Sequence, residues 1–231
     1  MPTNFHLLGP AHLLILATVP VLAAVLAAIQ RRLPPGFKGL RIGFAISLLL
    51  DSVLYYAHLA AHGQLTFPDR LPLELCDASL CLVIVALFTV NRAVFDLAYY
   101  LALGGATMAL LTPNLWEPFP SFTTVQFFVA HGLIVTGVLY LVWSRQARPR
   151  PGSVGKAMLA VNIYAAVVGT FDFLFKTDYM YLRAKPPNVS LLTFLGPWPW
   201  YIAASECVAF GVFLLLYLPF RQSAAHPGLR V

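Results

Sequence analysis

Long runs of apolar residues, separated by short polar connections, dominate this chain of 231 residues. Most runs are about 20 residues long, which is the length an α-helix needs to cross the hydrocarbon core of a bilayer. No polar stretch between them is long enough to fold alone. The pattern predicts an all-α fold, a polytopic membrane bundle of about seven transmembrane helices that forms a single integral membrane domain over residues 1–231. The expected spans cover residues 10–29, 40–61, 72–90, 93–111, 123–143, 156–175 and 200–220.

Positive charges in the connections predict the orientation of this bundle. Lys and Arg gather at residues 31–41, at residues 145–156 and in the tail after residue 220. Seven spans place all three regions on one side, and short basic loops favour the cytoplasmic side of a membrane. We therefore expect the N-terminus outside and the C-terminus in the cytoplasm, and a bacterial cytoplasmic (inner) membrane as the location.

Composition agrees with a membrane protein, since 59% of the residues are hydrophobic and only 10% are charged. Mean hydropathy is +0.77, and the net charge of +6 fits the loop charges and lipid headgroups. Basic residues do not alternate with aromatic ones, so no nucleic acid is expected as a partner. The first apolar run lacks a basic leader, and we interpret it as a retained span. The sequence does not indicate an oligomeric state.

The segment Leu-Pro-Leu-Glu-Leu-Cys-Asp at residues 71–77 opens the third span and carries the most unusual chemistry. Pro72 suits the first helical position, and Glu74, Cys76 and Asp77 follow at once. Charged groups inside a span are expensive and are usually retained for a function. No Cys-x-x-Cys pair occurs among Cys76, Cys81 and Cys207, and we expect neither a metal nor another cofactor.

Ionisable side chains from five predicted spans fall in the outer half of the bundle. His131 lies roughly 12 Å below the outer end of the fifth span at 1.5 Å per residue. Cys76 enters from the same end, so the two match in depth. The full set is His58, Glu74, Cys76, His131, Asp172 and Glu206. This clustering predicts a functional cavity.

Each of these residues also has a simpler structural interpretation. Cys76 can serve as a small hydrophobic residue, and His131 as a core histidine whose nitrogens are satisfied. Alternatively, Asp51, His58, Asp172 and Glu206 form the relay of a small-solute or proton-coupled carrier. A third possibility is a membrane protein that binds a ligand without chemistry.

Several of these residues lie in motifs that resemble the YwaF-like bacterial integral membrane proteins. The motifs are residues 71–76, His131, the run Asp-Tyr-Met-Tyr-Leu at 178–182 and the run Leu-Gly-Pro-Trp-Pro-Trp-Tyr at 195–201, with Phe5, Gly9 and His12 near the start. That family is related to a eukaryotic transmembrane acyltransferase that remodels ether phospholipids. The resemblance implies that Cys76 and His131 carry the chemistry.

The resemblance and the residues together predict a lipid acyltransferase or lipid-ester hydrolase. Cys76 attacks an ester carbonyl to form a thioester, and His131 accepts the thiol proton and later protonates the leaving alkoxide. His58 or Asn114 assists at the oxyanion or the headgroup. Glu74, Asp172, Glu206 and Trp198 are expected to support the site or the substrate, which is a membrane phospholipid or another acyl lipid.

Overall fold

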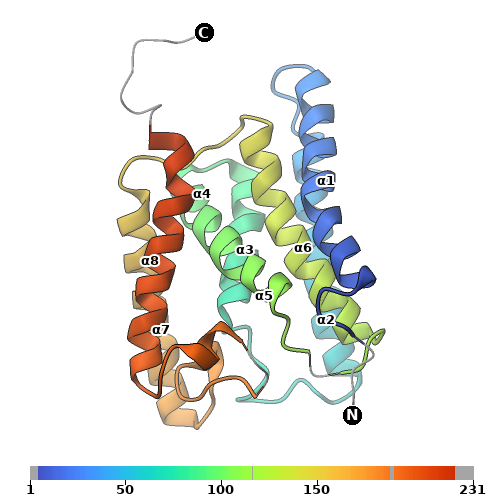
Figure 1. Cartoon of the computed structure of the whole chain (residues 1–231). Helices are drawn as coiled ribbons and strands as arrows, with labels where there is room; N and C mark the ends of the chain where they lie inside the picture. Colours follow the sequence, from blue (N-terminus) through green and yellow to red (C-terminus); the bar gives the residue numbers. More distant parts are fainter. Residues whose placement is uncertain (1–4, 116, 188–189, 222–231) are drawn as a thin grey trace.

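The computed structural model describes residues 5–115, 117–187 and 190–221, and these residues form helices and connections without any strand (Figure 1). The α-helices are α1 (Pro10–Arg32), α2 (Gly39–Ala61), α3 (Leu75–Thr89), α4 (Arg92–Tyr100), α5 (Thr107–Leu111), α6 (Phe122–Trp143), α7 (Ser153–Phe175) and α8 (Trp200–Arg221). Three further short elements are a π-helix, η1 (Leu101–Ala106), and two 3-10 helices, η2 (Tyr179–Tyr181) and η3 (Leu191–Phe194). The predicted all-α helical bundle is confirmed.

Six helices are long and apolar enough to cross a membrane in the described part of the chain. One of them is composite, because α4, η1 and α5 continue into one another over Arg92–Leu111. The seventh apolar helix, α3, has only 15 residues. At 1.5 Å per residue it measures roughly 22 Å, which is less than the hydrocarbon thickness of about 30 Å. The bundle thus has six full-length candidate spans and one shorter apolar helix.

The start of α3 differs from the sequence prediction. The helix begins at Leu75, so Pro72 precedes it and does not occupy its first position. Glu74 is the capping residue, and its backbone N–H donates to Asp77 Oδ2 at 3.1 Å. The Leu73 carbonyl accepts a hydrogen bond from the Tyr164 hydroxyl at 3.0 Å. These contacts hold residues before Leu75 outside the helix, which apolar periodicity alone does not reveal.

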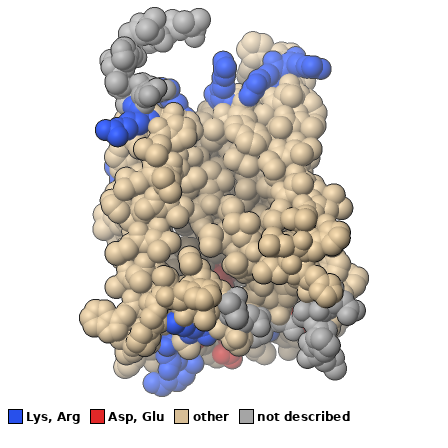
Figure 2. All heavy atoms as spheres, in the orientation of Figure 1, with Lys and Arg blue, Asp and Glu red and all other residues tan. Residues whose placement is uncertain are grey.

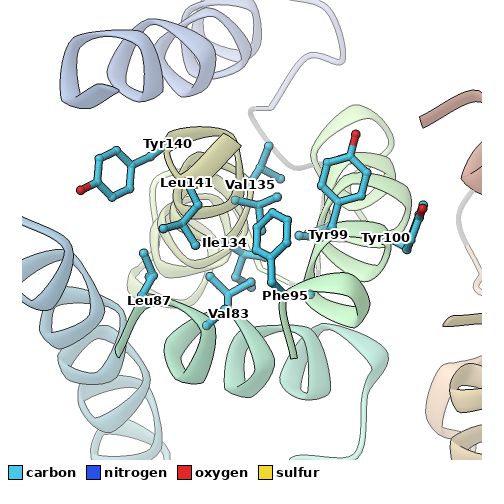
Figure 3. Packing of buried hydrophobic residues seen from close by; sticks show 14 of the residues in the cluster. Val83, Leu87, Phe95, Tyr99, Tyr100, Ile134, Val135, Tyr140 and Leu141 are labelled. Atoms are coloured by element: carbon cyan, nitrogen blue, oxygen red, sulfur yellow. The ribbon is translucent and has the colours of Figure 1, made fainter. Parts of the chain in front are cut away.

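The core lies where α3, α4 and α6 pack together in the middle of the bundle (Figure 3). α1 packs against α6, and α2 packs against both α3 and α6. On the opposite side, α7 packs against α4, and α8 packs against α7 and η1. Close approach is needed at Gly137 of α6, where an added Cβ would lie 3.1 Å from Val83 Cγ1. Helices α3 and α6 therefore pack tightly at this level.

Arginines at one end of the bundle bind helix ends. The side chain of Arg31 donates to the Trp143 carbonyl at the end of α6, and Arg41 donates to the Leu87 carbonyl near the end of α3. A cation at a helix C-terminus is favoured by the helix dipole and supplies donors for unpaired carbonyls. Figure 2 shows Lys and Arg along this end, where the α1–α2 and α6–α7 connections and the end of α8 meet. The loops predicted to be cytoplasmic thus lie together.

Candidate functional site

Two segments that are about 100 residues apart in sequence meet at the start of α3. Glu74 Oε2 accepts a hydrogen bond from the Met180 N–H at 2.9 Å. The Tyr179 hydroxyl donates to the Pro68 carbonyl at 2.7 Å and accepts from the Leu71 N–H at 2.8 Å. The motifs at 71–77 and 178–182 therefore form one connected structure. Because η2 follows α7, this contact also links α7 to α3.

Asp172, near the end of α7, binds the loop that contains η2. Its side chain is fully buried, and Oδ1 accepts from the Thr177 hydroxyl at 2.6 Å and from the Tyr179 N–H at 3.1 Å. Its other oxygen, Oδ2, has no hydrogen-bond partner among the described residues. Burying a carboxylate is costly unless it is hydrogen-bonded. The two bonds to Thr177 and Tyr179 therefore indicate that Asp172 holds this loop in place.

The Cys76 thiol is half-buried in the first turn of α3, between Glu74 and Asp77. The Tyr56 hydroxyl of α2 donates to Asp77 Oδ1 at 3.3 Å. Tyr164 of α7 binds the Leu73 carbonyl, and Met180 of η2 binds Glu74. The segment that carries Cys76 is thus contacted by α2, α7 and η2, and Glu74 and Asp77 of the same segment supply two carboxylates.

Tyr181 occupies a strained position in η2, next to Met180, which binds Glu74. Met180 and Tyr181 both have φ of +56°, a conformation that residues other than glycine seldom adopt. Such strain costs on the order of 1–3 kcal/mol for each residue and persists only where the surroundings enforce it. Asn114 Nδ2 donates to the Tyr181 hydroxyl at 2.8 Å. Burial raises the pKa of the Tyr181 phenol and outweighs the opposite effect of that hydrogen bond, so the phenol stays protonated near neutral pH.

His131 lies in the core of α6 with only 7% of its surface exposed. Its Nδ1 is 2.7 Å from the Phe127 carbonyl, and the ring packs on the Phe127 ring at 4.2 Å between centroids. A carbonyl can only accept, so Nδ1 carries the proton and Nε2 keeps a lone pair. His131 therefore has the tautomer that a general base needs.

Helix geometry places Cys76 and His131 at the same level. Cys76 lies seven residues before Val83, and His131 lies seven residues before Val138, so each pair shares a helix face about two turns apart. Val83 and Val138 belong to one buried core cluster, and α3 and α6 run in the same direction (Figure 1). No hydrogen bond joins the Cys76 thiol to His131 in this structure. Their pairing in catalysis stays a prediction.

The comparison with known families agrees with the membrane bundle. The model of the TMEM164 family, a family of membrane proteins, matches residues 7–217. The chain belongs to the TMEM164 family. The comparisons with curated proteins and with solved structures gave no match.

The other predicted site residues of this TMEM164-family chain lie apart from Cys76 in separate contacts. His58 stacks on Phe122 at 4.1 Å and on His62 at 4.1 Å between centroids, near the start of α6. Glu206 Oε2 accepts from Asn162 Nδ2 at 2.8 Å, which joins α8 to α7. Trp198 is 61% exposed, and its Nε1 donates to the Leu182 carbonyl at 3.1 Å. The structure thus connects Glu74, Asp172 and Asn114 through the loop that meets the Cys76 segment, and among the described residues no hydrogen bond links His58 or Glu206 to that loop.

Sequence reasoning missed the phenols around Cys76. Tyr56 and Tyr164 lie in apolar spans, where tyrosine is ordinary and gives no distinct signal. Tyr181 was part of a recognised motif, but its position beside Cys76 follows from the long-range contact between η2 and residues 71–77. Figure 2 shows a hollow between α8 and α6 with an acidic side chain visible inside it. A separate shallow cavity of about 100 Å³ is lined by Phe5, His6, Gly9, Pro10, Ala11 and Phe119, none of which was predicted as a site residue.

Proposed function

We propose that this protein transfers or hydrolyses acyl chains of membrane lipids, with Cys76 as the nucleophile and His131 as the base. The substrate is a phospholipid or another acyl lipid that enters from the bilayer, and the location is a bacterial cytoplasmic membrane. The observation that carries the proposal is the meeting of the two motifs at a half-buried thiol. These motifs, at 71–77 and 178–182, are the ones that resemble the acyltransferase-related family.

The residues next to Cys76 decide how the thiol loses its proton. Glu74 and Asp77 flank the thiol, and their negative charges oppose a preformed thiolate. The thiol proton therefore passes to His131 Nε2 as sulfur attacks the ester carbonyl. The thioester then passes its acyl group to a lipid hydroxyl or to water.

The carrier alternative needs its polar residues to form one connected path for protons. The structure gives each candidate its own local partner: Asp51 Oδ2 accepts from Gln126 Nε2 at 3.0 Å, Asp172 binds Thr177 and Tyr179, and Glu206 binds Asn162. These pairs fit helix-to-helix and helix-to-loop anchoring. They favour the acyl-transfer proposal over a proton relay.

Acyl exchange between mixed phospholipids by the purified protein, followed by mass spectrometry of the lipids, tests this function. Cys76→Ala and His131→Ala should each abolish exchange, and the double variant should be no slower than either single one, because the two residues act as a unit. Cys81→Ala is the matched control, since this exposed thiol lies on the same helix. Full activity in Cys76→Ala would exclude the thioester mechanism, and solute flux in liposomes that is lost in Asp51→Asn would favour the carrier.

A further inference from the structure

The proton of the Tyr181 hydroxyl differs from those of four other phenols at this end of the bundle. These four donate to protein acceptors: Tyr56 to Asp77, Tyr164 to the Leu73 carbonyl, Tyr179 to the Pro68 carbonyl and Tyr201 to the Tyr181 carbonyl. The Tyr181 hydroxyl instead accepts a hydrogen bond from Asn114 Nδ2. Among the described residues no acceptor takes its proton, so this O–H is available to a ligand.

The backbone holds Tyr181 in place at an energetic cost. Residues 180 and 181 both adopt the left-handed conformation, and three contacts hold them there. The Met180 N–H binds Glu74, the Tyr181 carbonyl accepts from Tyr201, and the Tyr181 hydroxyl accepts from Asn114. Strain of this kind gathers at functional sites, where a side chain must be pre-positioned. Here the side chain is the phenol next to Met180, whose N–H binds Glu74 two residues before Cys76.

We propose that Tyr181 donates its hydroxyl proton in a hydrogen bond to the carbonyl oxygen of the acyl ester that Cys76 attacks. This inference rests on the proposed function. As the C–S bond forms, the π electrons of the carbonyl move onto its oxygen, and the Tyr181 O–H stabilises that charge without giving up its proton. When the carbonyl re-forms, the C–O bond to the alcohol breaks, and the alkoxide takes its proton from His131 Nε2. The acyl group is then a thioester on Cys76.

The charges near this phenol restrict the substrate class. Glu74 and Asp77 are neighbours of Cys76 in the chain, and Asp178 precedes η2, which binds Glu74, so three acidic residues lie in the two segments that meet here. A neutral donor such as a phenol suits a neutral carbonyl, whereas neighbouring carboxylates repel an anionic one. The site therefore takes an O-acyl ester and discriminates against a free fatty-acid carboxylate, which also favours release of that product if water is the acceptor.

The test compares two reactions of Cys76 in the purified full-length protein in detergent micelles. Acylation by a fatty-acyl p-nitrophenyl ester develops negative charge on a carbonyl oxygen, whereas alkylation by iodoacetamide at the same thiol does not. Tyr181→Phe should slow acylation by about 100- to 1000-fold, the usual effect of losing one oxyanion donor. Its alkylation rate, followed by mass spectrometry of the Cys76 peptide, should stay within about twofold of wild type.

Two further variants complete the design. Asn114→Asp places an acceptor beside Tyr181 that captures its proton, so acylation should fall as in Tyr181→Phe, and the double variant should be no slower. Tyr164→Phe, whose proton is already used by Leu73, should retain acylation within about tenfold. If wild type acylates Cys76 and Tyr181→Phe does so equally fast, the role of Tyr181 is overturned and the proposed function stands. If wild-type Cys76 is alkylated but never acylated, the proposed function fails and the Tyr181 inference fails with it.

Discussion

Two buried histidines of this protein are fixed in opposite tautomers by their backbone partners. His12 Nδ1 accepts from the Leu8 N–H at 3.0 Å, and its Nε2 lies 2.7 Å from the Leu110 carbonyl. His12 therefore carries its proton on Nε2 and has both nitrogens satisfied. His131 carries its proton on Nδ1, bound to Phe127, and keeps Nε2 for another partner. The same residue type thus has a structural role in α1, whereas in α6 its free Nε2 suits the proposed role as a base.

Nitrogen-15 NMR of histidine-labelled protein in micelles tests this assignment. We expect an unprotonated Nδ1 in His12 and an unprotonated Nε2 in His131, because carbonyl acceptors fix the opposite nitrogens. His131→Asn and His12→Asn supply the resonance assignments. A protonated Nε2 in neutral His131 would remove its lone pair and contradict its role as the base.

At the residue scale, the depth of a side chain within the bundle was predictable from sequence, but its hydrogen-bond partners were not. Cys76 and His131 were placed at one level because residue number along a helix gives depth directly. Glu206 has a similar depth, yet it pairs with Asn162 of α7 and, in the described part of the chain, forms no hydrogen bond with Cys76 or His131. Which helix faces which neighbour depends on packing between helices, and a single sequence of nearly all-round apolar spans carries little information on it.

At the scale of the elements, α4 is held by the α6–α7 connection. The basic residues of that connection were used in the sequence analysis only to predict the orientation of the bundle. Asp96 of α4 is 2% exposed, and its carboxylate accepts from the Arg150 backbone N–H and from the guanidinium at 2.7 Å. Arg150 lies in the α6–α7 connection. A single arginine therefore neutralises a buried acid and fixes the start of α7.

Removing this guanidinium should destabilise the bundle. In Arg150→Ala, Asp96 loses two charge-assisted hydrogen bonds and remains buried, which should cost about 1–3 kcal/mol. Thermal unfolding in micelles measures the change. Arg148→Ala is the matched control, because Arg148 is exposed in the same connection and should shift stability by less than about 0.5 kcal/mol. Adding Asp96→Asn should recover part of the loss, and equal effects of both arginine variants would contradict the anchoring role.

Helix positions were largely predictable, since apolar length and flanking charges define spans in a membrane. The start of α3 and the π-helix η1 were not. Residues 71–74 stay outside α3 because Tyr164 and Met180 bind them from distant parts of the chain. In η1, an added Cβ on Gly104 would lie 2.8 Å from a carbon of the Phe213 ring, so glycine there permits the close approach of α8. Such long-range contacts have no local sequence signature.

The two ends of the whole molecule are built from different connections. One end joins the basic connections and the C-terminal end of α8, and the other joins the N-terminal segment, the η2–η3 loop and the start of α3 (Figure 1). The positive-inside rule predicts the first end in the cytoplasm. The site around Cys76 then faces the outer leaflet.

Single-cysteine labelling with a membrane-impermeant maleimide tests this orientation in intact cells. In a background without Cys76, Cys81 and Cys207, we expect Gln64→Cys to be labelled from outside and Arg148→Cys only after permeabilisation. Both positions are exposed, so accessibility within the protein is matched. Labelling of position 148 alone in intact cells would reverse the orientation.

The central claim is that an acyl chain passes through Cys76, and the most direct test is to detect that chain on its sulfur. Purified protein is mixed with phospholipid that carries an isotope-labelled acyl chain, quenched in acid during turnover, and digested for mass spectrometry. The account predicts the labelled acyl group on the peptide that contains Cys76, released by hydroxylamine as a thioester and absent from Cys76→Ala. Continued acyl exchange with an unmodified Cys76, and with Cys76→Ala as fast as wild type, would contradict it.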